Sequence, residues 1–502
     1  MNHLLVAPLL LPLAGGALAL LVRGLAAQRI VGVMASVALL AVAIMLFGVA
    51  ADGATATYDV GDWPVPYGIT LVLDRLSATL LLVAAVLAVA VAVYSLGGAD
   101  RRGQHFHALL QFQLLGVNGA FLTGDLFNLF VFFEVLLIAS YALLMHDSRP
   151  ERTLAAIHVV VLNLVGSVLF LVAVGCIYSA AGSLNFADLA ERAASLPPDR
   201  EGLWRAGGWL LLIVFALKAA LLPLGFWLPG AYAAADGAVA ALFAILTKVG
   251  VFAILRTGTL LFGDLGLGPV LFALALVTLG LGAVGMLAAR RLGGLVAHAV
   301  IVSVGTLLVS ASLFSAAGLA AATYYLMHGT LATALLFLLA DRIAAVRGAA
   351  GDRLEAAVAI RGRVALPVAF VLAAVATVGL PPTGGFVAKV AILEAATEAG
   401  RAAAVFPVLL LVSLLSIVAL ARAGSTLFWK AGPGVGEDTE PLQVGGKAAA
   451  SFGIGLLLLA LGLLAVFAGP ALEYAEATAA QLLDADGYVQ AVRASNLARG
   501  EH

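Results

Sequence analysis

The sequence predicts an all-α integral membrane protein with about fourteen transmembrane helices. Of its 502 residues, 63% are hydrophobic and 11% are charged, whereas soluble domains are roughly 45–50% apolar and 25% charged. Apolar runs of about twenty residues recur along almost the whole chain, and each is long enough to cross a hydrocarbon core of about 30 Å as a helix. The formal net charge of -1 gives no reason to expect nucleic-acid binding.

Glycine, proline and charged residues separate the apolar runs and mark the predicted helix ends. The first run, from Leu4 to Val22, has no basic n-region and no small-residue cleavage site, so we expect a retained helix rather than a signal peptide. The single cysteine, Cys176, lies inside an apolar run, which excludes an intrachain disulfide and a cysteine-based metal cluster. The helices are centred near residues 12, 40, 86, 114, 136, 166, 214, 248, 278, 304, 328, 378, 415 and 458.

Arginines are concentrated in the odd-numbered connections between these helices. By the positive-inside rule those connections face the cytoplasm, which places both chain ends outside. The arginines concerned are Arg23, Arg29, Arg101, Arg102, Arg149, Arg152, Arg290, Arg291, Arg342, Arg347, Arg353, Arg361 and Arg363.

Two segments outside the helices have patterns of their own. The second connection, ADGATATYDVGDWPVPYG, alternates aromatic or apolar residues with polar ones, which predicts a small extracytoplasmic β-hairpin or, more simply, a capping loop. Residues from about Leu472 to Leu497 have the spacing of an interfacial amphipathic helix, although a fraying tail is equally compatible with the pattern. Asp74 and Asp125, at the starts of two helices, are predicted to be interfacial charges.

Ionisable residues inside the apolar runs are the candidates for function. Glu134 is the single charge between Phe127 and Met145. A charged group at mid-bilayer costs at least about 2.5–3.5 kcal/mol on insertion scales, so it is expected to be paired or to face water inside the protein. Unlike arginine, a buried lysine can release its proton. Three of the five lysines lie within apolar spans: Lys218, Lys248 and Lys389.

Prolines interrupt two of the lysine-bearing helices. Pro223 has no N–H and leaves the carbonyl of Ala219 without its helical partner, next to Lys218. Broken helices at membrane depth are tolerated where they line a hydrated or protein-filled cavity. The second break is predicted at Pro381, Pro382, Gly384 and Gly385, before Lys389. Two such helices suggest a duplicated transporter core, although the lysine precedes the proline in one helix and follows it in the other.

His328, near the middle of its apolar run, has the ring chemistry for proton transfer. Other histidines have weaker claims and are expected to be structural: His105, His107, His158 and His298. No GxxxxGKS/T loop, metal-binding histidine pair or sodium cage of carboxylates is apparent. The energy for transport is therefore expected to come from an ion gradient or from a partner subunit.

Four segments together resemble the antiporter-like subunits shared by Mrp-type cation/proton antiporters and respiratory complex I. They are FFEVLLIASYALL, LPLGFWLPGAYAAADGAVAALFAILTKVGVFAILR, YYLMHGTLATALLF and GLPPTGGFVAKVAILEA. The resemblance covers roughly residues 70 to 430, and within the family it is strongest to the D-type subunits of Mrp complexes, with which the length and the helix number agree.

The resemblance implies two inverted five-helix repeats, helices four to eight and nine to thirteen, with helices seven and twelve broken. The chain then divides into residues 1–105 with three helices and the hairpin, residues 106–262 and 263–430 with one repeat each, and residues 431–502 with the last helix and the tail.

It also implies roles for individual residues. Glu134 matches a helix-five glutamate whose partner is the helix-seven lysine, here Lys218. Lys248 matches the central lysine of helix eight, His328 a histidine that carries the relay into the second repeat, and Lys389 the terminal ionisable residue of helix twelve. Some complex I relatives have glutamate at that last position, so lysine here argues against those subunits.

The implied function is proton translocation in a multisubunit Na⁺/H⁺ antiporter of the bacterial plasma membrane, without a cofactor. The expected partners are the other Mrp subunits, of the A, B, C, E, F and G types, together with protons, Na⁺ and membrane lipid. Two alternatives stay open: a proton-pumping subunit of complex I or of a membrane-bound hydrogenase, and a non-conducting structural subunit in which Glu134 and Lys218 merely pin two helices together.

Overall fold

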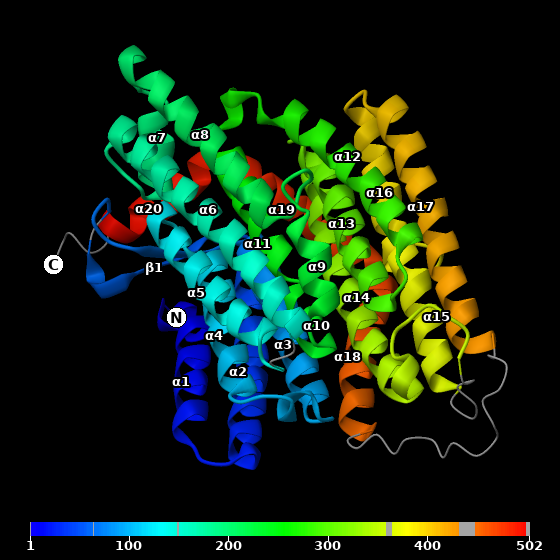
Figure 1. Ribbon diagram of the computed structural model, residues 1–502. Helices are drawn as coiled ribbons and strands as arrows, with labels where there is room; N and C mark the ends of the chain where they lie inside the picture. Colours follow the sequence, from blue (N-terminus) through cyan, green and yellow to red (C-terminus); the bar gives the residue numbers. More distant parts are fainter. Residues whose placement is uncertain (1, 64, 148–149, 358–363, 431–446, 498–502) are drawn as a thin grey trace.

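The computed structural model describes residues 2–63, 65–147, 150–357, 364–430 and 447–497, and the predicted cytoplasmic residues Arg149, Arg361 and Arg363 lie outside these ranges. Helices make up almost all of it (Figure 1). The helices that run through the bundle are α1 (Ala7–Leu21), α2 (Leu25–Ala51), α3 (Arg75–Ser95), α4 (Phe106–Leu122), α5 (Leu126–Leu144), α6 (Pro150–Ala181), α8 (Pro198–Lys218), α9 (Trp227–Ala234), α10 (Gly237–Phe243), α11 (Leu246–Leu260), α12 (Leu267–Ala288), α13 (Leu292–Ala311), α14 (Ala316–Arg347), α15 (Ala365–Val378), α16 (Gly384–Glu398), α17 (Ala402–Gly424) and α18 (Lys447–Val466).

The predicted number of spans is confirmed. Among the described residues, 11 helical segments are long and apolar enough to cross a membrane, and α4 and α15 are shorter apolar helices. The remaining predicted span is α8, whose first turns contain charged residues and whose last turns are apolar. The bundle is broad: α1 and α2 lie at one edge and α16 and α17 at the opposite edge (Figure 1).

Both predicted helix interruptions are present. The first lies between α8 and α9 and contains Pro223, and the second lies between α15 and α16 and contains Pro381 and Pro382. At the second break α15 is capped by the following residue, Gly379, whose φ of 76° is the left-handed conformation that glycine adopts without steric cost. Gly384 and Gly385, predicted to loosen the break, instead form the first turn of α16.

A third interruption was not predicted. The helix around Lys248 is divided into α10 and α11, with a turn at residues 244–245. The cause is a side chain: the hydroxyl of Tyr232, on α9, donates a hydrogen bond of 2.8 Å to the carbonyl of Phe243. The ladder tightens there, because the Lys248 N–H bonds the carbonyl of Ile245, three residues back.

The long helix α14 forms the centre of the bundle. It packs against α3, α10, α13, α15, α16, α18 and α19 (Ala468–Leu483). Most of its side chains are buried, whereas α2, α6 and α17 each expose a row of large apolar side chains. Such rows are the expected surface towards lipid or towards partner subunits.

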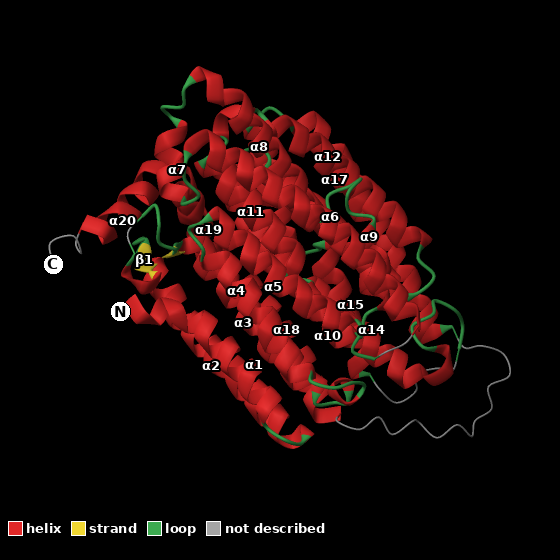
Figure 2. Ribbon diagram, turned by 60° about the vertical axis from the view of Figure 1, so that its left-hand side comes forward, coloured by secondary structure: helices red, strands yellow, loops and turns green. Residues whose placement is uncertain are grey.

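A small β-hairpin, one of the two predicted possibilities, is present, but its second strand follows the predicted segment, residues 51–68. Strand β1 (Ala56–Asp59) pairs antiparallel with β2 (Thr70–Leu73), with Ala56 opposite Leu73. It lies close to Asn2–Val6, the first residues that the structure describes, and to the last described helix (Figure 2). The tail forms two helices, α19 and α20 (Ala485–Leu497), and α20 packs on β1 and on the short α7 (Phe186–Ala193). The tail is therefore a docked part of the fold rather than a fraying end.

Candidate functional site

Glu134 and Lys218 are joined through two neutral side chains of α6. The hydroxyl of Ser167 donates a hydrogen bond to the half-buried Glu134 carboxylate. One helical turn earlier, Asn163 Oδ1 accepts a hydrogen bond of 3.2 Å from Lys218 Nζ. Residues four apart share a helix face, so α6 presents both groups between the two charges. Neither residue was predicted to belong to the site, although their spacing of four within an apolar helix was an available signal.

Lys218 is the last residue of α8 and is only 5% exposed. Its Nζ also lies 5.9 Å from the centre of the Phe133 ring, a favourable position for an ammonium. A cavity of about 30 Å³ borders Lys218 and Asn163 and extends to Phe243 and Leu246, at the turn before Lys248. This volume is enough for a water molecule, and the lysine and the amide supply polar partners for one.

Lys248 is completely buried on α11. Its Nζ donates a hydrogen bond of 3.2 Å to the hydroxyl of Thr247. A Cβ atom on Gly250 would lie 2.5 Å from the backbone nitrogen of Ala219. The glycine thus lets the α11 backbone lie directly against the first break, one residue after Lys218, and the two lysines belong to adjoining segments.

His328 and Lys389 border one cavity of about 10 Å³ in the second half of the chain. The Nε2 atom of His328 lies 2.9 Å from the carbonyl of Ala376, which makes Nε2 the protonated nitrogen of the neutral ring. Its Nδ1 is buried and has no hydrogen-bond partner among the described residues. Lys389 Nζ donates to the carbonyl of Val378 at 2.6 Å and to Ser413 Oγ at 2.7 Å.

The two broken helices place their lysines in equivalent electrostatic positions. Lys218 terminates the first half-helix, α8, and the Lys389 side chain reaches back to Val378, the last residue of the first half-helix α15. The Lys389 ammonium therefore lies at the C-terminal end of a half-helix, and Lys218 is the last residue of the other half-helix, where the helix dipole favours positive charge. This explains why one lysine precedes its proline and the other follows it.

The relay candidates form two groups rather than a continuous chain of bonds. In the described part of the chain no hydrogen bond joins Lys248 to His328, and none of the three lysines lies within 4 Å of a carboxylate oxygen. His298 packs against Gly285 of α12 and bonds the carbonyl of Gly294, whereas His158 is exposed. His107, which the sequence suggested is structural, is buried with its Nε2 3.2 Å from Asp100.

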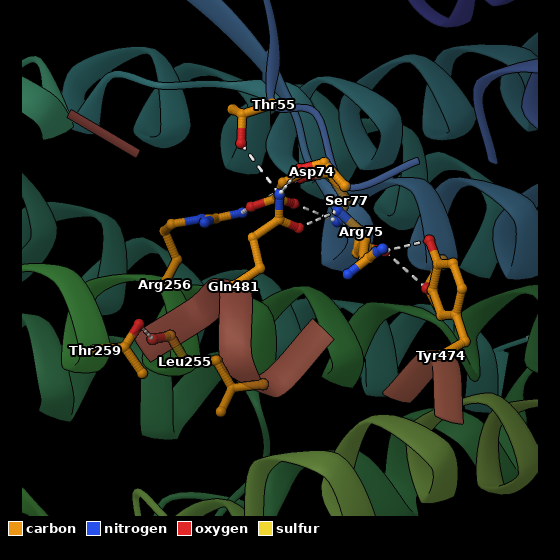
Figure 3. A network of polar contacts seen from close by, with 11 residues as sticks. Thr55, Asp74, Arg75, Ser77, Leu255, Arg256, Thr259, Tyr474 and Gln481 are labelled. Carbon is orange, nitrogen blue, oxygen red and sulfur yellow. Dashed lines mark hydrogen bonds and ion pairs between the residues drawn. The ribbon is translucent and has the colours of Figure 1, made fainter. Parts of the chain in front are cut away.

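A buried polar network at the hairpin end of the bundle was missed by the sequence analysis (Figure 3). Asp74 caps α3 and lies 2.5 Å from the Arg256 guanidinium of α11, and both side chains are buried. Nearby, Gln481 of α19 accepts a hydrogen bond from the Arg75 N–H and donates one to Thr55. Asp74, predicted to be an interfacial charge, is at the start of its span but is 3% exposed and paired with Arg256.

Asp125 is also more buried than predicted. Its carboxylate caps α5 by accepting a 2.7 Å hydrogen bond from the Asn128 N–H, and it is 9% exposed. Burial raises the pKa of Asp125 to about 6, although hydrogen bonds from the Asn128 and Phe127 backbones act in the opposite direction.

A second network lies at the other end of the bundle. Arg102 contacts Asp236, the N-cap of α10, and Asp341 of α14 at 3.2 Å, and the Tyr94 hydroxyl donates to Asp341 at 2.7 Å. Burial and the neighbouring Asp341 carboxylate raise the pKa of Asp236 to about 6. No group of three or more histidine, cysteine, aspartate or glutamate side chains suited to a metal ion occurs among the described residues.

Comparison with known proteins supports one family. The family described as "NADH:quinone oxidoreductase/Mrp antiporter, TM" matches residues 123–418. The D-type subunit of a probable K(+)/H(+) antiporter of Rhizobium meliloti is 39% identical over 524 residues, which cover 96% of this chain and 96% of that protein. The D-type subunit of the Na(+)/H(+) antiporter of Bacillus subtilis is 34% identical over 503 residues, which cover 98% and 99% of the two chains.

Chains in three solved structures have a similar fold. A chain in the structure of the Mrp complex from Dietzia sp. has a TM-score of 0.86 and 27% identity, over 98% of this chain and 100% of that one. A chain of the membrane-bound sulfane sulfur reductase, an archaeal respiratory membrane complex, has a TM-score of 0.85 and 25% identity, over 97% and 99%. For respiratory complex I from Thermus thermophilus the values are 0.80 and 26%, over 95% and 99%.

Proposed function

Because the chain belongs to the NADH:quinone oxidoreductase/Mrp antiporter family of transmembrane subunits, we propose that it is the proton-translocating subunit of a multisubunit monovalent cation/proton antiporter in the bacterial plasma membrane. The relatives named above that match over nearly their whole length are D-type subunits of such antiporters.

One observation supports proton transfer above all. Three lysines lie in membrane helices, and their nearest polar partners among the described residues are an amide, hydroxyls and a carbonyl rather than carboxylates. A permanently charged ammonium in such a place costs at least about 2.5–3.5 kcal/mol, and an ion pair would be the structural remedy. Lysines without one are suited to exchanging a proton.

The proposed relay runs from Glu134 through Lys218, Lys248 and His328 to Lys389. The ionised Glu134 favours the protonated form of Lys218 across the Ser167 and Asn163 bridge. When the carboxylate is neutralised or moves away, Lys218 passes its proton through the water-sized cavity towards Lys248. A membrane potential supplies about 2.3 kcal/mol per charge per 100 mV, comparable with a pKa shift of one or two units.

The cation and the partners follow from the relatives. One is named a K(+)/H(+) and the other a Na(+)/H(+) antiporter subunit, so we propose a monovalent cation, with Na⁺ as the first choice. Among the described residues no group of three or more histidine, cysteine, aspartate or glutamate side chains is arranged to hold a metal ion. The partners are the other Mrp-type subunits, of the A, B, C, E, F and G types.

The test is to purify the tagged chain in mild detergent and to identify the subunits that accompany it by mass spectrometry. Small hydrophobic subunits and one longer homologous subunit are expected. Iron–sulfur or flavin proteins among the partners would contradict the antiporter assignment and would make the chain the proton-pumping arm of a redox complex, like the sulfane sulfur reductase and complex I structures that it resembles.

A further inference from the structure

A groove of about 560 Å³ opens at the end of α12, and none of the relay residues lines it. It is bordered by the connection from α12 to α13, by the loop after α14 and by the end of α17. Four arginine side chains and one glutamate line it: Arg290, Arg291, Arg353, Arg422 and Glu355. Four guanidinium groups against one carboxylate leave an excess of positive charge.

The backbone beneath these arginines is held rigidly. Arg291 and Arg353 face each other in an antiparallel bridge. The Leu292 N–H bonds the carbonyl of Asp352 at 2.8 Å, and the Leu354 N–H bonds the carbonyl of Arg290 at 2.9 Å. The two connections therefore form one platform, which presents three of the arginines from fixed backbone positions.

Two further contacts complete the platform. The buried Arg347 donates hydrogen bonds to the carbonyls of Gly351, Arg353 and Glu355, which orders the loop after α14. Arg422 donates to the carbonyl of Leu287 at 2.6 Å, and so anchors its guanidinium at the C-terminal end of α12. The backbone that carries Arg290, Arg291 and Arg353, and the guanidinium of Arg422, are thus held in place at the groove.

Apolar helix faces lead from the groove along the membrane spans. On α17, Arg422 shares a face with the exposed Val418, Leu414 and Leu411, which lie at intervals of three or four residues. A second exposed apolar face starts at the groove residue Ala288 and runs along α12. Its face contains Val284, Leu281 and Val277, all about half exposed. The two helices pack against each other.

We propose that this groove binds an anionic phospholipid whose headgroup has two phosphates, as in cardiolipin. The arginines receive the phosphates, because a guanidinium matches a phosphate with two parallel hydrogen bonds. The acyl chains lie along the exposed faces of α12 and α17. Basic pockets at the ends of membrane helices are suited to such headgroups, and the positive-inside rule predicts that this end faces the cytoplasmic leaflet.

The test uses the intact complex, stripped of lipid in detergent, and measures bound lipid by native mass spectrometry during titration. Cardiolipin is expected to bind roughly tenfold more tightly than phosphatidylcholine, and the double substitution R290Q/R291Q is expected to remove that preference. The matched control is R23Q/R101Q, which removes two exposed arginines from odd-numbered connections outside the groove. It is expected to bind cardiolipin like the unsubstituted complex.

Three results would overturn the proposal. The first is unchanged cardiolipin binding in R290Q/R291Q. The second is displacement of cardiolipin by an equal concentration of inorganic pyrophosphate, because the groove would then be a site for soluble anions. The third is loss of a partner subunit from R290Q/R291Q, which would identify the groove as a protein interface. The charge-preserving R290K/R291K variant is expected to recover only part of the binding, because lysine restores the charge but not the two parallel hydrogen bonds of a guanidinium. A binding level between those of R290Q/R291Q and the unsubstituted complex separates loss of charge from misfolding.

Discussion

Asn163 and Ser167, one turn apart on α6, connect the Glu134 carboxylate to the Lys218 ammonium without a direct ion pair. A direct buried pair would hold both charges in place and would be costly to separate. Coupling through neutral hydrogen-bonding groups allows Lys218 to change its protonation state while the charge of Glu134 still acts on it electrostatically. At the residue scale this is the difference between a structural bridge and a relay.

The Glu134→Gln substitution tests this coupling. Glutamine retains an oxygen that can accept the Ser167 hydrogen bond but removes the charge, so the complex is expected to assemble normally. Cation-dependent proton transport in inverted membrane vesicles, followed with a pH-sensitive dye, is expected to fall to about a tenth or less, because the charge that favours protonated Lys218 is lost. The control is Glu476→Gln, on the exposed face of α19. Full transport by the Glu134 variant would exclude a role for its charge.

The charged residues of the relay could be predicted from sequence because charges are rare in apolar spans. Their neutral partners could not, because serine and asparagine also occur in membrane helices as ordinary links between helices. The Asp74 to Arg256 pair was missed for another reason. The two residues are 182 positions apart and each lies near a span end, so nothing in the local pattern distinguishes them from interfacial charges.

At the scale of the element, the broken helices are explained by their prolines, but the close packing around them depends on glycines. A Cβ atom on Gly385 would lie 2.6 Å from His328 Nε2 and 2.5 Å from the carbonyl of Ala376. These are the two atoms joined by the histidine's hydrogen bond. The glycine therefore allows α16 to lie against the His328 site. From the sequence alone, Gly385 was predicted only to loosen the helix break.

We expect Gly385→Ala to separate α16 from His328 and to reduce transport, with a loss of thermal stability of about 1–3 kcal/mol from overpacking. Gly455→Ala, on α18, is the matched control because a Cβ atom there has no neighbour within 4 Å. Thermal unfolding and vesicle transport would be measured for both variants. Equal behaviour of the two would contradict the close approach at His328.

The cap of α5 makes a prediction about pH. The pKa of Asp125 in the folded protein is about 6, above the value of about 3.9 in an unfolded chain. Its ionisation therefore costs stability above pH 6, and the cost disappears as the pH falls towards 4. Asp125→Asn keeps a capping oxygen and is expected to raise stability at pH 8 by about 1–2 kcal/mol, with no difference at pH 4.

Asp125→Ala provides the comparison, because it removes the cap as well as the charge. It is expected to lose about 1 kcal/mol relative to Asp125→Asn at both pH values. Thermal unfolding of the purified complex at pH 4 and pH 8 measures both effects. A stability gain for Asp125→Asn that is equally large at pH 4 would show that burial of the ionised carboxylate is not its cause.

At the scale of the whole molecule, the relay residues lie on helices from both halves of the chain, and the polar networks at the two ends join them to the rest. Arg256 connects α11 to α3, and its guanidinium also lies 5.2 Å from the ring of Tyr488 on α20. Arg102 joins the connection before α4 to α10 and α14. The N-terminal helices and the tail are thus fastened directly to the helices that carry Lys248 and His328.

The overall architecture was largely predictable, because the length and spacing of apolar runs determine where spans occur. The sequence was compatible with either a hairpin or a capping loop after the second helix, and with either a helical or a fraying tail. Tertiary packing, which the local pattern does not contain, determines which of them forms. The turn between α10 and α11 could not be predicted, since it depends on how α9 is oriented so that its Tyr232 hydroxyl reaches the carbonyl of Phe243. The boundaries of the two proposed repeats stay predictions.

The central claim is that Lys248 transfers protons between the two halves of the relay. The most direct test compares the purified complex with its Lys248→Met variant in proteoliposomes, with proton movement recorded after a sodium or potassium gradient is imposed. We predict that the variant assembles with all its partners but shows no cation-dependent proton movement, while the exposed Lys430→Met control is fully active. Normal proton movement by Lys248→Met would contradict the relay, and loss of assembly would favour a purely structural lysine.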